Sequence, residues 1–146
     1  MEDLKVAIGN EFLTSSDSKV DSKSFAGVGI VCVYFSAHWC PPCRSFTPKL
    51  AEIYTKYNES GKKVEIIFTS RDKDVDSYNK YRKTMPWLAL AFENPINSNL
   101  ATLYHLSGIP TLVVLSSKGK IICDDGYEPI LLKGEKAFDE WIALTK

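Results

Sequence analysis

Apolar residues recur along this chain in two patterns, one typical of buried strands and the other of amphipathic helices. The segment 29–35 is continuously apolar and rich in β-branched residues, which is typical of a central strand covered on both faces. Shortly after it, Phe46, Leu50 and Tyr54 recur at helical spacing on one apolar stripe. We therefore expect a buried strand that leads directly into a helix.

The same alternation continues to the end of the chain. The further expected elements are, in order, a strand at 64–69, helices at 75–83 and 97–106, a strand at 111–115, a hairpin strand at 121–123 and a helix at 135–144. This order predicts an α/β fold with a central mixed β-sheet flanked by helices on both faces. Residues 14–24 are polar and are expected to form a surface loop. Since no linker or repeat divides the chain, we expect one domain over residues 1–146.

Charge and hydropathy argue against several functional classes. Eighteen basic residues balance eighteen acidic ones, so the chain lacks the basic excess that nucleic-acid and membrane-surface binders usually carry. The first residues are acidic, unlike the basic start of a signal peptide, and no stretch approaches the roughly 20 apolar residues that span a bilayer. We therefore expect a cytoplasmic protein that binds neither nucleic acid nor membrane.

Cys40 and Cys43 form a Cys-x-x-Cys pair between the first predicted strand and the first predicted helix. Four cysteines are too few for a secreted disulfide scaffold, and in a reducing compartment this spacing indicates redox or metal chemistry. Unpaired amides and the helix dipole favour a thiolate at a helix N-terminus, and Pro41 suits the first helical position because its missing N–H costs little there. We therefore expect a lowered pKa for Cys40, with Cys43 one turn behind it and more buried.

This arrangement predicts a two-step thiol–disulfide exchange. The Cys40 thiolate attacks a substrate disulfide, and Cys43 then resolves the mixed disulfide by attacking the Cys40 sulfur. No bound cofactor is needed, because the cysteine pair itself stores the two electrons. Metal binding and simple core packing are the alternatives, but a structural zinc site uses four ligands and no second Cys-x-x-Cys exists. Of the other cysteines, Cys32 is expected to be buried and inert, and Cys123 to be more exposed.

Three motifs resemble the nucleoredoxin and tryparedoxin group of the thioredoxin superfamily. The first is Trp-Cys-Pro-Pro-Cys at 39–43, within a longer similar run at 34–45, and it is far more specific than Cys-x-x-Cys alone. The second is Met-Pro-Trp-Leu-Ala at 85–89, and the third is Ile-Pro-Thr-Leu at 109–112. The resemblance covers roughly residues 25–122, which is most of the chain.

The resemblance implies a thioredoxin fold with a substrate groove beside Cys40. In the family, the proline that corresponds to Pro110 is preceded by a cis peptide bond and faces the reactive sulfur, so Ile109 and Pro110 are expected to line the groove. Trp39 and Trp87 are expected to flank the groove as an apolar platform, with core packing as the alternative for Trp87.

Pro41 and Arg44 are further expected substrate contacts, with a solvated helix face as the alternative for Arg44. The sequence also departs from its relatives at two positions. Tyr34 stands where many thioredoxins carry a buried Asp that assists the resolving cysteine, which leaves the proton acceptor for Cys43 open between water and a carboxylate from elsewhere. Arg71 stands where tryparedoxins carry a Trp implicated in trypanothione binding, so a nucleoredoxin-like role fits better.

Two functions remain open from the sequence. The first is a protein-disulfide reductase that acts as a monomer on disulfide-containing proteins or small disulfides and is recharged by an upstream reductase or dithiol donor. The second is a redox-dependent protein-binding module of the nucleoredoxin type, in which Cys40 and Cys43 switch a surface in signalling. The family also suggests a nuclear pool beside the cytoplasmic one.

Overall fold

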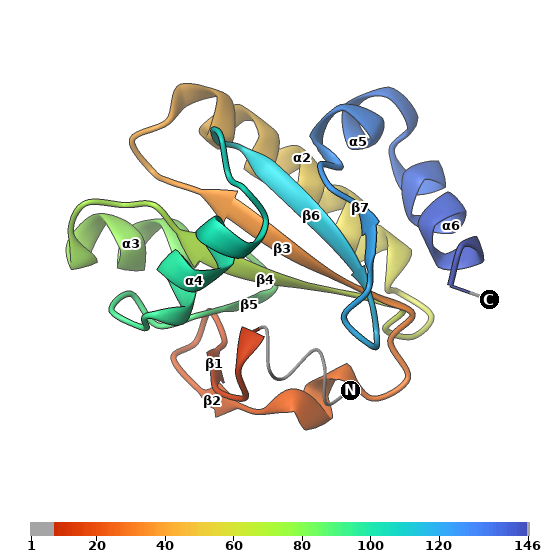
Figure 1. The fold of residues 1–146 in the computed structure, drawn as a ribbon, viewed down its shortest axis with the longest axis horizontal. Helices are drawn as coiled ribbons and strands as arrows, with labels where there is room; N and C mark the ends of the chain where they lie inside the picture. The colour runs from red at the N-terminus through yellow and green to blue at the C-terminus, as the bar shows by residue number, and fades with distance from the viewer. Residues whose placement is uncertain (1–7, 146) are drawn as a thin grey trace.

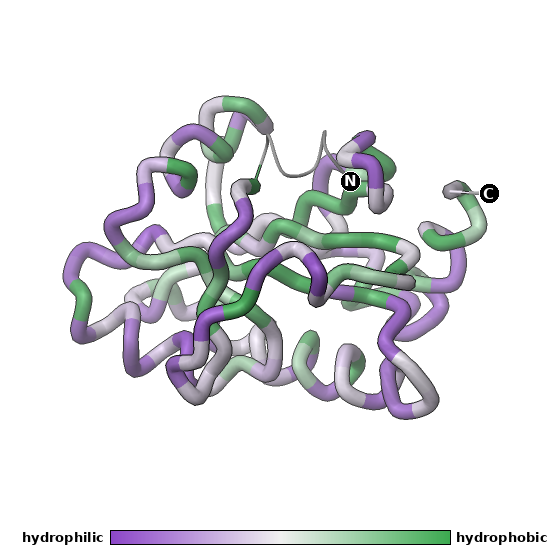
Figure 2. Tube along the Cα trace, turned by 90° about the horizontal axis from the view of Figure 1, so that it is seen from below, coloured by the Kyte–Doolittle hydropathy of each residue, from purple (hydrophilic) through white to green (hydrophobic). Residues whose placement is uncertain are grey.

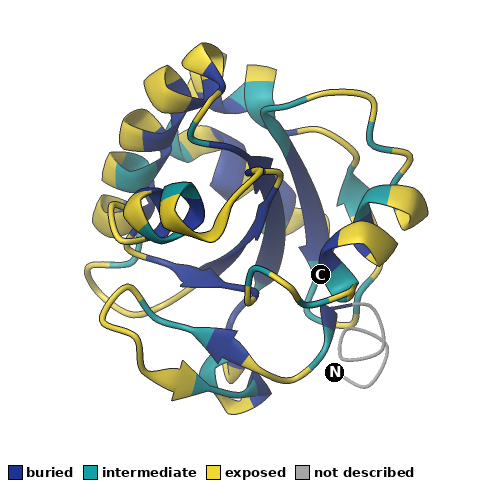
Figure 3. Ribbon diagram, turned by 90° about the vertical axis from the view of Figure 1, so that its left-hand side faces the viewer, coloured by how far each residue is buried: buried dark blue, intermediate teal, exposed yellow. Residues whose placement is uncertain are grey.

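The structure, a computed structural model, describes residues 8–145 and contains one seven-stranded sheet in the order β2-β1-β5-β4-β3-β6-β7 (Figure 1). The strands are β1 (Phe12–Leu13), β2 (Lys19–Val20), β3 (Ile30–Ser36), β4 (Val64–Ser70), β5 (Leu88–Ala89), β6 (Thr111–Ser116) and β7 (Ile121–Cys123). β3 and β4 are buried along their whole length and form the dark centre of Figure 3.

The sheet is mixed, as expected. β3 pairs in parallel with β4 and antiparallel with β6, and β4 pairs in parallel with β5. β1 pairs antiparallel with β5 and with the edge strand β2, and β7 pairs antiparallel with β6 at the other edge. Both faces of the two central strands are covered, which explains why β3 is almost continuously apolar and why most of β4 is apolar too.

Helices cover both faces of the sheet. They are the 3₁₀ helix η1 (Ser22–Phe25) and the α-helices α2 (Pro41–Tyr57), α3 (Val75–Arg82), α4 (Ile96–Leu103), α5 (Tyr127–Lys133) and α6 (Glu135–Ala143). Side chains of α2, α3, α5 and α6 form one core with Cys32 and Tyr34, whereas α4 and the N-terminal segment form another with Val31 and Val33. Figure 2 shows hydrophobic segments concentrated in the layer between the helices. Within residues 8–145, none of the helices combines the length and the apolar character needed to cross a bilayer.

The longer predicted elements are confirmed, and the differences concern short ones. β1, β2 and β5 have only two residues each, too few to show an alternating pattern, and Pro129 within α5 argues against a helix there. The loop expected at 14–24 is wrong in part, since it contains β2 and overlaps η1. Buried Arg82 holds this segment in place by donating to the carbonyl oxygen of Thr14 and pairing with the carboxylate of Asp17.

Candidate active site

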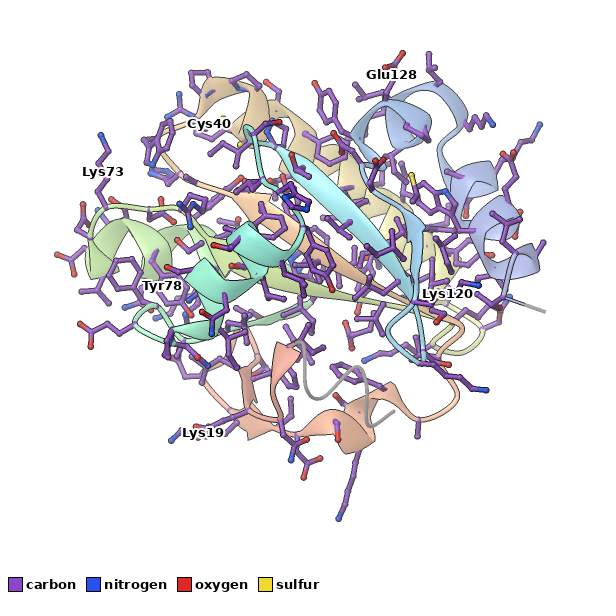
Figure 4. The ribbon with its side chains drawn as sticks, viewed as in Figure 1. Lys19, Cys40, Lys73, Tyr78, Lys120 and Glu128 are labelled. Carbon is purple, nitrogen blue, oxygen red and sulfur yellow. The ribbon has the colours of Figure 1, made fainter. Side chains whose placement is uncertain are left out.

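The Cys-Pro-Pro-Cys segment lies where the chain passes from β3 into α2. Cys40 is the N-cap residue of α2, and Pro41 occupies the first helical position, where the absence of its N–H costs no helical hydrogen bond. Cys43 follows within the first turn, and both thiols are free. Figure 4 shows Cys40 at the end of the molecule opposite Lys19. The predicted placement of the pair at a strand-to-helix junction is therefore confirmed.

The two thiols differ in burial in the expected order. Cys40 is 5% exposed, whereas Cys43 is 0% exposed. Burial raises the pKa of the Cys43 thiol, and its hydrogen bond with Cys40 raises this pKa further, so the two sulfurs are close enough to interact. Solvent therefore reaches Cys40 first, with Cys43 behind it. Within residues 8–145, no group of three or more His, Cys, Asp or Glu side chains is placed to hold a metal ion.

Four of the expected substrate contacts surround Cys40. The carbonyl oxygen of Ile109 lies 3.9 Å from the Cys40 sulfur, and the Ile109–Pro110 peptide bond is cis, as the resemblance implies. Both residues are partly buried, so part of each faces solvent. Pro41 and Arg44 are exposed on the first turn of α2. These four residues are thus available to a molecule that approaches Cys40.

Trp39 stands out from the surface beside the cysteine pair. Its side chain is 51% exposed, which is unusual for an indole ring. The indole N–H donates to the carbonyl oxygen of Arg71 at 3.0 Å, and the ammonium nitrogen of Lys73 lies 5.6 Å from the ring centroid. Lys73 and Cys40 accordingly lie at the same end of the molecule in Figure 4. Trp39 is therefore held as an oriented, accessible aromatic surface.

Asp72 orders the loop under Trp39, a role that no sequence pattern above indicates. One carboxylate oxygen accepts the His38 amide proton at 2.7 Å, and the other accepts the Ser70 hydroxyl proton at 2.7 Å. Asp72 therefore ties the segment before Cys40 to the end of β4. An Asp two residues beyond a buried strand was the available signal, but its partner lies 34 residues away.

The expectation that Trp87 flanks the groove is wrong. Trp87 is only 2% exposed and packs edge-to-face against Tyr34 and Tyr54, at centroid distances of 5.9 and 5.5 Å. Its indole nitrogen is buried and has no hydrogen-bond partner among residues 8–145. The short strand β5 follows Trp87 directly and fixes its backbone at the sheet, so the ring points into the core. Core packing, the alternative interpretation, is the correct one.

A cluster of buried hydroxyl groups lies behind Cys43, and no sequence pattern indicated it. The Tyr34 and Thr47 hydroxyl oxygens are 2.7 Å apart, and those of Thr47 and Tyr81 are 2.6 Å apart. The Tyr81 hydroxyl also lies 2.7 Å from that of Ser36. The Tyr34 position therefore holds a neutral, hydrogen-bonded phenol rather than a carboxylate.

Comparisons with known proteins agree with this fold. Residues 27–121 match the family model described as thioredoxin-like. The chain is 46% identical to cattle (Bos taurus) nucleoredoxin over 125 residues, which cover 85% of this chain and 28% of that protein. It is 40% identical to the probable nucleoredoxin 1 of Arabidopsis thaliana over 129 residues, covering 88% of this chain and 22% of that protein.

Solved structures give the same assignment. Tryparedoxin I from Crithidia fasciculata superposes with a TM-score of 0.79 at 34% identity, covering 86% of this chain and 87% of that chain. Tryparedoxin from Trypanosoma brucei superposes with a TM-score of 0.82 at 34% identity. The match covers 96% of this chain and 95% of that chain. The chain therefore belongs to the thioredoxin-like family, within its nucleoredoxin and tryparedoxin group. It spans only about a quarter of the length of the nucleoredoxins that it matches.

Proposed function

We propose that this protein is a thiol–disulfide oxidoreductase that reduces protein or low-molecular-weight disulfides through Cys40 and Cys43. The observation that carries this proposal is the graded burial of the two interacting thiols at the start of α2, with Cys40 on the solvent side and Cys43 behind it. A nucleophile must reach its substrate, whereas a resolving thiol must reach only the nucleophile.

The proposed cycle moves two electrons. The Cys40 thiolate attacks one sulfur of a substrate disulfide, the substrate S–S bond breaks, and one substrate thiolate leaves. Cys43 then attacks the Cys40 sulfur, and the second substrate thiolate leaves with the proton that Cys43 gives up through solvent. The protein ends with a Cys40–Cys43 disulfide, and the substrate becomes a dithiol when its first thiolate takes up from solvent the proton that Cys40 lost on ionising. An upstream dithiol or reductase returns the pair to the thiol form.

The surface around Cys40 supports a peptide or small-thiol substrate. Trp39 offers an exposed ring, and the Ile109 carbonyl lies next to the reactive sulfur, where an extended substrate backbone would run. Pro41 and Pro110 add apolar contacts, and Arg44 adds a cation for a substrate carboxylate. Tryparedoxin II, which is 33% identical to this chain, has been solved in complex with glutathionylspermidine, and this supports a small glutathione-containing thiol as one molecule that the surface binds.

A redox-dependent binding module is the second candidate. The similarity to nucleoredoxins, together with an exposed Trp39 directly before the redox pair, favours it. In this role, oxidation of Cys40 and Cys43 would change the surface around Trp39 and alter its affinity for a protein partner. The two candidates share the site and differ in turnover.

Turnover of insulin disulfides distinguishes the candidates. We expect the wild type to accelerate insulin reduction by dithiothreitol, and Cys40→Ser to lose this acceleration. Cys123→Ser is the matched control, since it removes a partly exposed thiol outside the pair and should keep full activity. If insulin were reduced no faster with the wild-type protein than with dithiothreitol alone, catalysis would be refuted and the redox-dependent binding module would be the remaining candidate.

A further inference from the structure

We infer that the buried hydroxyls of Tyr34, Thr47, Tyr81 and Ser36 form a directed hydrogen-bond chain that ends at the Cys43 sulfur and promotes its ionisation. The inference rests on the proposed function, because it assigns these residues to the resolving step. It concerns positioning residues only, since none of the four exchanges a bond with substrate.

The chain is continuous and enclosed. Its three links join Tyr34 to Thr47, Thr47 to Tyr81 and Tyr81 to Ser36, at oxygen–oxygen distances of 2.7, 2.6 and 2.7 Å. All four residues are buried. Thr47 follows Cys43 by one turn on the buried face of α2, and Ser36 is the last residue of the strand that leads to the pair. Thr47 and Ser36 therefore tie this polar cluster to the two elements that lead into and out of the Cys40–Cys43 segment.

Counting protons gives the direction of the chain. Four hydroxyls carry four protons, and the three links use three of them. When Tyr34 donates to Thr47, Thr47 to Tyr81, and Tyr81 to Ser36, the Ser36 proton remains for Cys43. In the opposite direction the last proton would remain on Tyr34, and the Cys43 sulfur would receive no hydroxyl proton from the chain. The direction toward the sulfur satisfies every hydroxyl.

The electrostatics of the cluster agree with this direction. The Ser36 side chain and the Ala37 main chain both lower the pKa of Cys43, against the larger effect of burial. Burial in turn raises the pKa values of Tyr34 and Tyr81, so both phenols keep their protons. The cluster therefore stabilises the thiolate by donation and does not act as a base. The proton of Cys43 leaves through solvent to the departing substrate thiolate.

A single-turnover reaction with dithiobis-nitrobenzoate separates the two steps. Attack by Cys40 releases one nitrothiobenzoate in a phase that depends on reagent concentration. Attack by Cys43 releases a second in a unimolecular phase. A Cys123→Ser background removes the half-buried thiol, while Cys32 is fully buried and unreactive. The pH dependence of the second phase then reports the ionisation of Cys43.

Ser36→Ala should slow the second phase by about threefold to tenfold near neutral pH and move its pH midpoint upward by about one unit. Fewer Cys43 thiolates form, although each is somewhat more nucleophilic. Tyr81→Phe should have the same effect to a smaller extent, and Tyr34→Phe the least, because they are one and three links further along the hydrogen-bond chain than Ser36. The first phase should change by less than about twofold in all three variants.

Tyr78→Phe is the matched control. Tyr78 lies on the same helix as Tyr81, is equally buried, and donates to the carbonyl oxygen of Leu90 outside the cluster. Loss of the Tyr78 hydroxyl should destabilise the fold without changing the rate of the second phase or its pH midpoint. The inference would be overturned if Ser36→Ala and Tyr81→Phe kept the wild-type pH midpoint of the second phase. It would also be overturned if Tyr78→Phe shifted this midpoint as much as Ser36→Ala does. Absence of a second phase in the wild type would instead refute the proposed function.

Discussion

The Cys40 sulfur lies 3.9 Å from the carbonyl oxygen of Ile109, although the two residues are 69 positions apart in sequence. The sheet explains this proximity. β6 pairs antiparallel with β3, with Phe35 opposite Thr111, so the residues just before Thr111 lie beyond the end of β3. Cys40 follows that end of β3 and meets Ile109 there. The predicted groove thus joins two motifs that only the sheet brings together.

Trp39 should contribute to substrate binding rather than to stability. We expect Trp39→Ala to lower kcat/KM for insulin reduction by about tenfold, the equivalent of roughly 1.4 kcal/mol of lost aromatic contact. The free energy of unfolding should change by less than about 1 kcal/mol, because Trp39 is already half exposed to solvent. Leu132→Ala on α5 truncates another exposed apolar side chain and should leave kcat/KM unchanged. Equal activity of Trp39→Ala and the wild type would contradict this role.

Trp87 should show the reverse pattern. Trp87→Ala is expected to lower the free energy of unfolding by about 3–5 kcal/mol, because it opens a cavity in the core. Trp87→Phe should cost less, since within the described part of the chain the indole nitrogen makes no hydrogen bond that could be lost. Urea unfolding measures both variants, and insulin kinetics on Trp87→Phe should give a KM within about twofold of the wild type. A large rise in the KM of Trp87→Phe with an unchanged free energy of unfolding would show that Trp87 contacts substrate, which contradicts a role in core packing.

Alkaline pH should destabilise the reduced protein. Burial raises the pKa values of Cys32 and Cys43 above their ordinary value of 9.0 in the folded state. Above pH 9 the unfolded chain loses these protons first, so unfolding releases protons and becomes more favourable as the pH rises. The stabilisation is complete below that pH and declines above it, by at most about 1.4 kcal/mol per pH unit for each thiol.

Urea unfolding between pH 7 and 10.5 tests this dependence. Cys32→Ala removes one of the two thiols, so its stability should fall less steeply than that of the wild type above pH 9. Oxidation to the Cys40–Cys43 disulfide removes the other and should have a similar effect. If the free energy of unfolding fell equally steeply above pH 9 in the reduced wild type, in Cys32→Ala and in the oxidised protein, these thiols would not be the cause of the alkaline destabilisation.

The sequence predicted the parts of the fold that have long, regular patterns. The buried strands β3 and β4 and the helix α2 followed from continuous apolar runs and from helical spacing, and the redox pair followed from its position between them. Two-residue strands carry no period, which is why the sequence did not indicate β5 and left groove and core as equal alternatives for Trp87.

Long-range polar contacts were equally inaccessible. The sequence indicated that Tyr34 replaces a carboxylate, but it could not show that its hydroxyl meets Thr47, or that Thr47 meets Tyr81 from α3. Such contacts depend on how helices pack on the sheet, and no local spacing encodes them. For the same reason the sequence did not indicate that the Asp72 carboxylate accepts a hydrogen bond from the His38 backbone N–H.

The attack of Cys40 on a disulfide is tested most directly by trapping the intermediate. Cys43→Ser, incubated with a disulfide-linked peptide and analysed by intact mass and peptide mapping, should carry one peptide joined to Cys40. Cys40→Ser should carry none at the pair under the same conditions. An adduct found only on Cys123, or equal adduct formation by both variants, would contradict the assignment of Cys40 as the attacking thiol.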